Sequence, residues 1–160
     1  MMKLIAAVDE RWALGRDGKL LFSIPEDLAQ FRELTTGHII VYGSRTMQTF
    51  PGGRPLPNRK NIVLTHAPET VMPPAVGCDC VEKAAALAGA DGFVVGGASV
   101  YRQLLPRCDT AYITKVLADG AGDCFLPDLD AVPEWQCVFT SEQKTWNGLQ
   151  YRFLRYERRK

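Results

Sequence analysis

The chain has 160 residues, of which 46% are hydrophobic and 23% charged, and its 19 Lys and Arg side chains nearly balance 18 Asp and Glu side chains. This length suits a single domain, residues 1–160, that buries a core without disulfides or metal, and the formal net charge of +1 excludes a protein held to nucleic acid by bulk basicity. No apolar run is long enough to span a membrane and the first residues lack the features of a signal peptide, so we expect a cytoplasmic protein that binds neither nucleic acid nor membranes.

Apolar runs alternate with helical patterns over the first two-thirds of the chain. The predicted strands are Leu4–Val8, Ile39–Tyr42, Asn61–Thr65, Val76–Val81 and Phe93–Val95. The predicted helices are Pro25–Thr36, Arg45–Phe50, Glu82–Ala90 and Ser99–Pro106. Continuous apolar strands separated by helices indicate an α/β fold with a mostly parallel sheet covered by helices on both faces.

The last third of the chain has a different pattern. Ala111–Val116 is predicted to be a further strand, and the runs Gln136–Ser141 and Leu149–Tyr156 flank Asn147-Gly148. An Asn-Gly pair between such runs is a strong hairpin signal. We therefore expect a C-terminal antiparallel hairpin that makes the sheet mixed.

Metal and thiol chemistry find little support in the sequence. The five cysteines are an odd number, and Cys78-Asp79-Cys80 has no second pair or nearby histidine to complete a zinc site. No Gly-x-Ser-x-Gly motif occurs, and neither histidine has the spacing of a metal ligand. We expect reduced thiols and no metal site, and any enzymatic chemistry would belong to a bound cofactor.

A long stretch of the chain carries no negative side chain. Residues 34–68 contain no Asp or Glu but hold both histidines and four cations, namely His38, Arg45, Arg54, Arg59, Lys60 and His66. This stretch favours the binding of anionic groups. Accident of composition, or packing of these cations against acids elsewhere in the chain, is the alternative.

Two predicted strands run into glycine and a hydroxyl at a helix start. Ile39–Gly43 leads into Ser44-Arg45-Thr46, and Phe93–Gly97 leads into Ala98-Ser99. Helix N-termini offer free N–H groups to phosphates, and glycine lets them approach. Two such junctions on one parallel sheet could hold a dinucleotide, although neither is Gly-x-Gly-x-x-Gly and no P-loop occurs.

Asp27 is predicted to lean onto the apolar side of the Pro25–Thr36 helix. It precedes Phe31 by four residues and Leu34 by seven, whereas Ser23 and Glu26 have the spacing of a capping box. A carboxylate beside an apolar pocket needs hydrogen-bond donors, which a ligand with a paired N–H and amino group could supply. An interaction with the helix dipole is the alternative.

The chain resembles the dihydrofolate reductase family over nearly its whole length. The resemblance rests on short pieces in the same order and spacing: Ile5-Ala6-Ala7-Val8-Asp9, Leu14-Gly15, Ile24 through Phe31, Val41 through Thr46, Gly53 through Asn61, Val94 through Tyr101, Tyr112-Ile113-Thr114, Gly122-Asp123 and Pro127-Asp128. It implies reduction of 7,8-dihydrofolate to tetrahydrofolate, with hydride from NADPH transferred to C6 and N5 protonated from water.

The resemblance also implies roles for individual residues. Asp27, Phe22 and Thr114 would be catalytic, with Asp27 holding the pterin amidine. The substrate would lie against Ile5, Ala6, Asp27, Leu28, Phe31, Arg54, Arg59 and Thr114, with Arg59 binding the glutamate carboxylate. NADPH would lie against Ala7, Leu14, Gly15, Leu20, Gly43, Ser44, Arg45, Thr46, Thr65, His66, Val95, Gly96, Gly97, Ala98, Ser99, Val100 and Tyr101. Among these, Arg45, Thr65 and His66 would surround the 2′-phosphate.

Several positions depart from the family pattern. Phe22 stands where many members have Trp, Leu21 replaces a frequent Pro and Met47 a frequent aromatic residue. Ser44 stands where an Arg often meets the cofactor phosphates, so selectivity for NADPH would depend on Arg45 and His66. The resemblance further implies a monomer that binds antifolate inhibitors.

Two other functions remain open from the sequence. A reductase of the same architecture that acts on a pyrimidine of the riboflavin pathway would also use NADPH, although Pro25 through Phe31 together with Arg59 favours folate. A non-catalytic module that senses reduced nicotinamide would leave Asp27 without a purpose. Consumption of NADPH with and without dihydrofolate separates all three.

Overall fold

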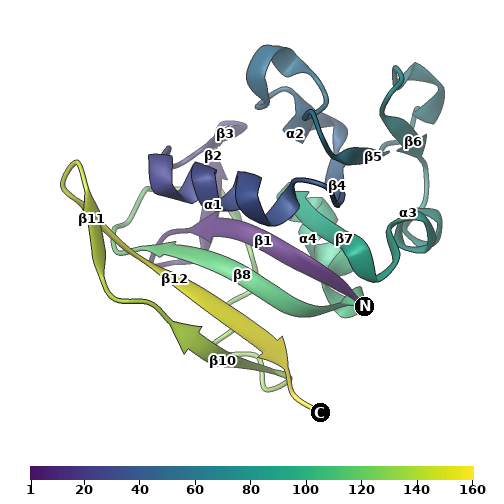
Figure 1. Cartoon of the computed structure of the whole chain (residues 1–160). Coiled ribbons are helices and arrows are strands. Elements are labelled where there is room, and N and C mark those ends of the chain that lie inside the picture. The colour runs from purple at the N-terminus through teal and green to yellow at the C-terminus, as the bar shows by residue number, and fades with distance from the viewer.

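One large twisted sheet forms the centre of the protein in a computed structural model that describes residues 1–160 (Figure 1). Its strands are β1 (Met2–Val8), β4 (Ile39–Gly43), β5 (Lys60–Leu64), β6 (Val76–Cys78), β7 (Gly92–Gly96), β8 (Cys108–Val116), β10 (Trp135–Thr140), β11 (Lys144–Trp146) and β12 (Leu149–Arg158). They lie in the order β10-β12-β8-β1-β7-β4-β5-β6, with β11 paired to β12. The pairs from β8 to β6 are all parallel, and β12 joins β8 antiparallel, which confirms the predicted mixed sheet.

Helices cover both faces of this sheet (Figure 1). They are α1 (Pro25–Thr35), α2 (Ser44–Met47), α3 (Val81–Ala88) and α4 (Ala98–Leu104), with single 3₁₀ turns at Pro51–Gly53, Pro68–Thr70, Gly89–Asp91 and Leu105–Arg107. Successive residues of a strand point to opposite faces, so β1 contributes to two cores. Leu4 packs with Leu104 of α4 on one face, whereas Ile5 belongs to the cluster covered by Phe31 of α1 on the other. None of the helices has the length and apolar character needed to cross a membrane.

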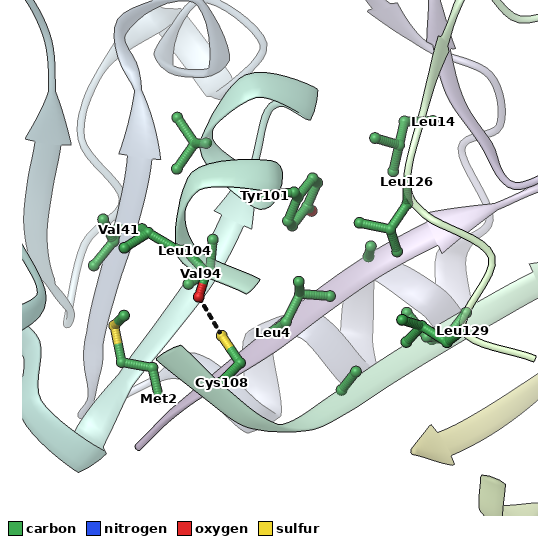
Figure 2. Close-up of a cluster of buried hydrophobic side chains, with 14 of the residues drawn as sticks. Met2, Leu4, Leu14, Val41, Val94, Tyr101, Leu104, Cys108, Leu126 and Leu129 are labelled. Carbon is green, nitrogen blue, oxygen red and sulfur yellow. Dashed lines mark hydrogen bonds between the residues drawn. The ribbon is translucent and has the colours of Figure 1, made fainter. Parts of the chain in front are cut away.

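The core beneath α4 also fixes the start of β8. Figure 2 shows Leu4, Val94, Leu104 and Cys108 converging between the sheet and the helix, and the Cys108 thiol donates to the Leu104 carbonyl oxygen at 3.4 Å. Burial raises the pKa of this thiol to about 12, so it stays protonated. Cys108 acts as a small apolar residue, and all five cysteines are free thiols.

A second, three-stranded sheet was not predicted. It consists of β2 (Ala13–Arg16), β3 (Lys19–Leu20) and β9 (Cys124–Phe125) in the order β3-β2-β9. Strands of two to four residues are too short to show an alternating pattern, and the partner of β2 lies far along the chain. This sheet holds the segment that carries Leu14, Gly15 and Leu20.

Some predicted boundaries were wrong. The strand predicted at Val76–Val81 ends at Cys78, and Val81 already begins α3. The helix predicted at Arg45–Phe50 is the single turn α2, and the one predicted at Ser99–Pro106 ends at Leu104, because Pro106 has no N–H to continue it. Asn147 (φ 49°) and Gly148 (φ 82°) do form a two-residue turn, but it joins β11 to β12, and β10 pairs with β12 beyond it.

The predicted capping box at Ser23 does not form. Ile24 is the N-cap of α1 and makes no side-chain cap hydrogen bond, while Pro25 occupies the first turn. Ile24 is buried with Val116 and Tyr151, and this apolar contact fixes how the chain enters the helix. Glu26 instead pairs with Lys144 Nζ of β11 at 3.1 Å, so it does not satisfy the helix start.

Candidate active site

Asp27 lies in the first turn of α1 and faces the central sheet. Thr114 Oγ1 of β8 donates a 2.6 Å hydrogen bond to Asp27 Oδ1. Burial raises the pKa of Asp27 above its ordinary value of 3.8, and the Thr114 hydrogen bond partly opposes this rise. Thr114 is its only hydrogen-bond partner and no cation pairs with it, so the carboxyl group has unused capacity to bind a ligand.

Apolar residues of two elements, β1 and α1, were predicted to accompany Asp27 in the site. Ile5 and Ala6 of β1 are buried, Phe31 of α1 is half-buried, and Leu28 is 45% exposed although it is large and apolar. The exposure of Leu28 is explained if a ligand rather than protein covers this side of α1. The structure brings Ile5 and Phe31 together on the face of the sheet that α1 covers, with Leu28 next to Asp27 on α1, whereas the Ala6 side chain belongs to the cluster on the opposite face.

Phe22 lies beside this group but contributes no polar atom. It packs against the cluster of Ile24, Val116 and Tyr151 and is half-buried. A Phe at this position can shape the cavity and exclude water, but it has no N–H with which to orient a water molecule.

Tyr101 is a buried polar group on the other side of β1. Its hydroxyl donates to the Ile5 carbonyl oxygen at 2.7 Å, linking α4 to the strand that carries Ile5 and Ala6. Burial and, second, the charge of Asp27 raise the pKa of Tyr101. The hydroxyl therefore stays protonated and remains a donor within electrostatic range of the carboxylate.

The two glycine-containing junctions meet at the carboxyl edge of the sheet, because β4 and β7 are neighbours. Gly96 has φ 134°, and a Cβ there would lie 3.4 Å from Thr46 Oγ1; a Cβ on Gly97 would lie 3.6 Å from the same atom. A Cβ on Gly43 would come within 3.2 Å of Val100. Only glycines leave the space between α2 and α4 open at this point.

This edge fits a pyrophosphate group. Neither α2 nor α4 has a side-chain cap, so the N–H groups of their first turns are not taken by protein side chains. Val95 and Gly96 end β7, and Ala98, Ser99 and Val100 form the first turn of α4. Thr46 brings a hydroxyl between the two junctions, which makes the residues present compatible with a dinucleotide.

Arg45, Thr65 and His66 follow the ends of adjacent parallel strands. Gly43 of β4 is in register with Leu64 of β5, which brings the residues after them to the same edge. Arg45 and His66 are exposed, and neither forms an ion pair. The other histidine, His38, bonds through Nδ1 to Asp91 at 2.5 Å, so it is not available to an anionic ligand.

Arg54 lies with residues predicted for the cofactor rather than with Arg59. A cavity of about 340 Å³ is lined by Ser44, Met47, Arg54 and Thr65 among others. The family resemblance implied a substrate role for both Arg54 and Arg59. The intervening prolines and turn direct the two side chains to different places.

Arg59 lies beside Phe31 with its guanidinium carbon 5.8 Å from the ring centre. Its Nε is buried without a hydrogen-bond partner, and its Nη2 makes only a long contact of 3.4 Å to Thr36 Oγ1. Burial and the neighbouring charge of Arg32 lower the pKa of Arg59. An unpaired buried N–H of this kind indicates a place for an anionic ligand.

Asn61 organises the segment that carries Arg59, a role that the sequence did not reveal. Its amide donates to the carbonyl oxygens of Leu56 and Arg59, both at 3.0 Å, and its Oδ1 accepts from Leu56 N and the Tyr42 hydroxyl. The only sign of this role in the sequence is a single polar residue at the start of an apolar strand. The buried amide therefore holds the Arg59 backbone in place.

The segment expected to flank the nicotinamide is held by backbone contacts. Leu14 and Gly15 lie in β2, Leu20 ends β3, and Ala7 is half-buried in β1. Gly15 O accepts from Asp123 N at 2.9 Å, and Asp123 Oδ2 accepts from Asp17 N at 3.0 Å. Leu20 is 61% exposed, which again leaves a large apolar side chain free to contact a ligand.

A larger cavity is lined by none of the residues described for the site, although Phe153 in its wall is in register with Thr114. It has a volume of about 790 Å³ between the outer side of α1 and strands β8, β10 and β12, and Glu33, Tyr112, Phe139, Phe153 and Arg155 contribute to its walls. None of its lining residues was predicted for the site. Cavity size alone therefore does not identify the functional site in this protein.

Comparisons with known proteins agree over the whole chain. Residues 1–158 match the family model described as dihydrofolate reductase. The chain is 38% identical to the dihydrofolate reductase of Bacillus subtilis (strain 168), over 99% of this chain and 95% of that protein. It is 36% identical to that of Mycobacterium tuberculosis (strain ATCC 25618 / H37Rv), over 99% and 98% of the two chains.

A solved structure shares the fold. Dihydrofolate reductase from Enterococcus faecalis, complexed with NADP(H) and RAB-propyl, is similar with a TM-score of 0.88 and 32% sequence identity. The similarity covers 100% of this chain and 97% of that one.

Proposed function

The chain belongs to the dihydrofolate reductase family, and we propose that Asp27 is the side chain that holds its substrate for reduction. It is an NADPH-dependent oxidoreductase that reduces 7,8-dihydrofolate to tetrahydrofolate. The observation that carries the proposal is the half-buried Asp27 carboxyl group, which has Thr114 as its single partner and the uncovered side chain of Leu28 beside it. A pterin offers a paired N–H and amino group, which match two carboxylate oxygens.

The protein contributes orientation and electrostatics to the reaction. NADPH, when bound, supplies the hydride that is transferred to C6. Asp27 fixes the ring through its amidine and favours the protonated form at N5, with water as the proton source. Thr114 holds Asp27 Oδ1 in place, and Phe22 limits the access of water to the ring.

Arg59 binds the glutamate carboxylate of the substrate in this proposal. The guanidinium is a planar group of N–H donors, its buried Nε has no partner in the protein, and the Phe31 ring lies beside it. Such a group is suited to donate hydrogen bonds to a carboxylate. Ile5, Leu28 and Phe31 would cover the rings between Asp27 at one end and Arg59 at the other.

The cofactor would lie along the carboxyl edge of the sheet. Gly96, Gly97 and Thr46 would hold the pyrophosphate, and Arg45, Thr65 and His66 the 2′-phosphate, since the Arg45 and His66 side chains have no anionic partner within the chain. Leu14, Gly15 and Leu20 would cover the nicotinamide. The likeness to an enzyme complexed with NADP(H) supports this direction of binding.

We propose a monomer as the active form. We expect this monomer to act in the cytoplasm as the single domain 1–160. Antifolate inhibitors with a paired amino and ring N–H group would compete for Asp27, because they offer the same donors as the substrate.

The test follows NADPH by its near-ultraviolet absorbance. Wild-type protein is expected to consume NADPH only when dihydrofolate is present, and Asp27→Asn is expected to bind NADPH normally but to lose roughly two to four orders of magnitude in turnover at neutral pH. The loss should be smaller at low pH, where solvent protonates the substrate. Equal loss at every pH would contradict the role given to Asp27, and binding of NADPH without consumption by the wild type would indicate a sensing module.

A further inference from the structure

We propose that Asp9 is a positioning residue that ties together the two segments enclosing the nicotinamide side of the site, an inference that rests on the proposed placement of the cofactor. Asp9 follows directly after β1 and is 0% exposed, yet no Lys, Arg or His pairs with it. The reaction as described does not use this carboxylate. A buried carboxylate without a cation must be satisfied by N–H donors.

Three backbone N–H groups donate to Asp9. Arg11 N and Ala13 N both donate to Oδ1 at 2.9 Å, and Gly120 N donates to Oδ2 at 2.8 Å. The first two bonds are local, whereas Gly120 is 111 residues further along the chain. One oxygen therefore closes a turn, and the other joins that turn to a distant segment.

The turn that Oδ1 closes leads directly into β2. Trp12, at its centre, has φ 63°, which is unfavourable for a residue other than glycine. The bonds to Arg11 and Ala13 on either side, together with Asp9 N to Ala13 O at 3.1 Å, hold this conformation. Leu14 and Gly15, which are assigned to the nicotinamide, follow Ala13 without a break.

The segment that Oδ2 joins packs against the other end of the same region. A Cβ on Gly120 would lie 2.9 Å from Leu21 Cδ1, next to Leu20, and a Cβ on Gly122 would lie 2.6 Å from the Ala13 Cβ. Residues 120–122 thus lie close to both ends of the segment from 13 to 21. The Asp9 bond to Gly120 adds a side-chain link at the start of this contact.

Backbone bonds also join the two segments: Glu10 N donates to Ala118 O at 3.1 Å and Asp123 N to Gly15 O at 2.9 Å. The Asp9 bond is the buried side-chain link between them, and the other charged link is more exposed. Arg11 and Asp119 form an ion pair of 3.8 Å with both side chains more than half exposed, which water and salt weaken. The Asp9 side chain is fully buried, so the loss of its hydrogen bond to Gly120 is expected to cost more free energy than the loss of this exposed ion pair.

Asp9→Asn separates the two functions of the carboxylate. In this variant the amide oxygen is expected to stay beside Arg11 N and Ala13 N and to accept from both. The opposite rotamer is less favourable, because it would place the NH₂ group against these two N–H donors instead of against one. The NH₂ group then faces Gly120 N–H, where no hydrogen bond can form. The substitution keeps the turn and removes only the Asp9–Gly120 bond, while the backbone bonds between the two segments remain.

The expected result is NADPH binding weakened roughly five- to tenfold, the consequence of one buried hydrogen bond lost with its donor left unpaired. The dissociation constant and KM of dihydrofolate should be unchanged, and the Gly120 amide proton should exchange faster with solvent in the free protein. The matched control is Asp119→Asn, an exposed carboxylate of the same segment, which should alter none of these quantities. A lower melting temperature with unchanged NADPH affinity would mean that Asp9 is only structural, and equal effects in both variants would mean that local charge is responsible; either result overturns the inference.

A measurement on the wild type covers the case in which Asp9→Asn fails to fold. If the Asp9 link positions the cofactor side, NADPH binding must in return stabilise that link, so that NADPH slows exchange of the Gly120 amide. Exchange that is the same with and without NADPH would overturn the inference. Turnover of NADPH and dihydrofolate by the same sample would show that the proposed function stands even then.

Discussion

Thr114 Oγ1 lies 2.6 Å from Asp27 Oδ1, although the two residues are 87 positions apart in the sequence. The bond joins the first turn of α1 to the carboxyl half of β8, across the face of the sheet. Because a hydroxyl donor favours the ionised carboxylate whereas burial favours the neutral acid, the pair sets how strongly Asp27 attracts a proton. The protonation of Asp27 should therefore be visible both in stability and in catalysis.

Asp27→Asn should make the ligand-free protein more stable at neutral pH. The pKa of Asp27 is raised in the folded state above its ordinary value of 3.8, so between these two values the folded protein holds a proton that the unfolded chain has released. The contribution of this group to stability is therefore present below about pH 3.8 and is lost as pH rises through the folded-state pKa. Asn avoids this loss, because its carbonyl oxygen can still accept from Thr114 without carrying a charge.

Urea unfolding at several pH values measures this effect. The difference in free energy of unfolding between Asp27→Asn and the wild type should grow as pH rises from about 4 toward 7. Glu26→Gln is the matched control, since Glu26 is exposed and should not show the same growth. A constant difference across this range would mean that Asp27 has the same proton affinity in the folded and unfolded chains.

Thr114→Val should shift the pH dependence of turnover while leaving the fold intact. The substitution keeps the shape of a buried side chain but removes the donor to Asp27, so the pKa of Asp27 rises further. The decline of kcat/KM at high pH should then begin at a higher pH than in the wild type. Thr114→Ser, which keeps the hydroxyl, should restore the original profile, and a Val variant with an unshifted profile would show that the bond has no influence on the reaction.

The parts of the fold that were predictable depend on continuous patterns. Apolar runs such as Ile39–Tyr42 are long enough to identify a buried parallel strand, and its burial confirmed that reading. The sheet of β2, β3 and β9 was missed, because two-residue strands have no period and their pairing depends on residues more than a hundred positions away. The N-cap at Ile24 was missed because burial against Val116 and Tyr151, rather than local hydrogen bonding, decides where α1 begins.

The candidate site shows the same limit. The spacing of Asp27 from Phe31 indicated a carboxylate on the apolar side of a helix, but nothing local indicated Thr114 as its partner, which came only from the family resemblance. Asp9 and Asn61 escaped notice for a related reason. Asp9 follows an apolar run and Asn61 begins one, and both are positions where turn residues are common. Only the tertiary fold brings their distant partners Gly120 and Tyr42 to them.

Arg59→Ala should weaken dihydrofolate binding roughly ten- to a hundredfold, as expected for the loss of charge-assisted hydrogen bonds to a carboxylate. NADPH affinity should not change, and both constants can be measured by titration of protein fluorescence. The melting temperature should not fall, because the substitution removes a buried Nε that has no partner in the protein. Arg59→Lys keeps the charge but not the planar pair of donors, so it should fall between the wild type and the Ala variant. A variant that lost NADPH affinity instead would contradict the assignment of Arg59 to the substrate.

Arg45→Ala combined with His66→Ala should reduce the preference for NADPH over NADH. Both side chains are exposed and lack an anionic partner at the edge where β4 and β5 end in register, so a 2′-phosphate would be their natural counter-ion. Each lost bond to a phosphate should cost about 1.5–3 kcal/mol at low ionic strength and less at high salt. The quantity to measure is the ratio of kcat/KM for NADPH to that for NADH, with His38→Ala as control, because His38 is bound to Asp91 away from this edge. An unchanged ratio would place the 2′-phosphate elsewhere, and the cavity beside Ser44 and Arg54 is then the next position to examine by Arg54→Ala.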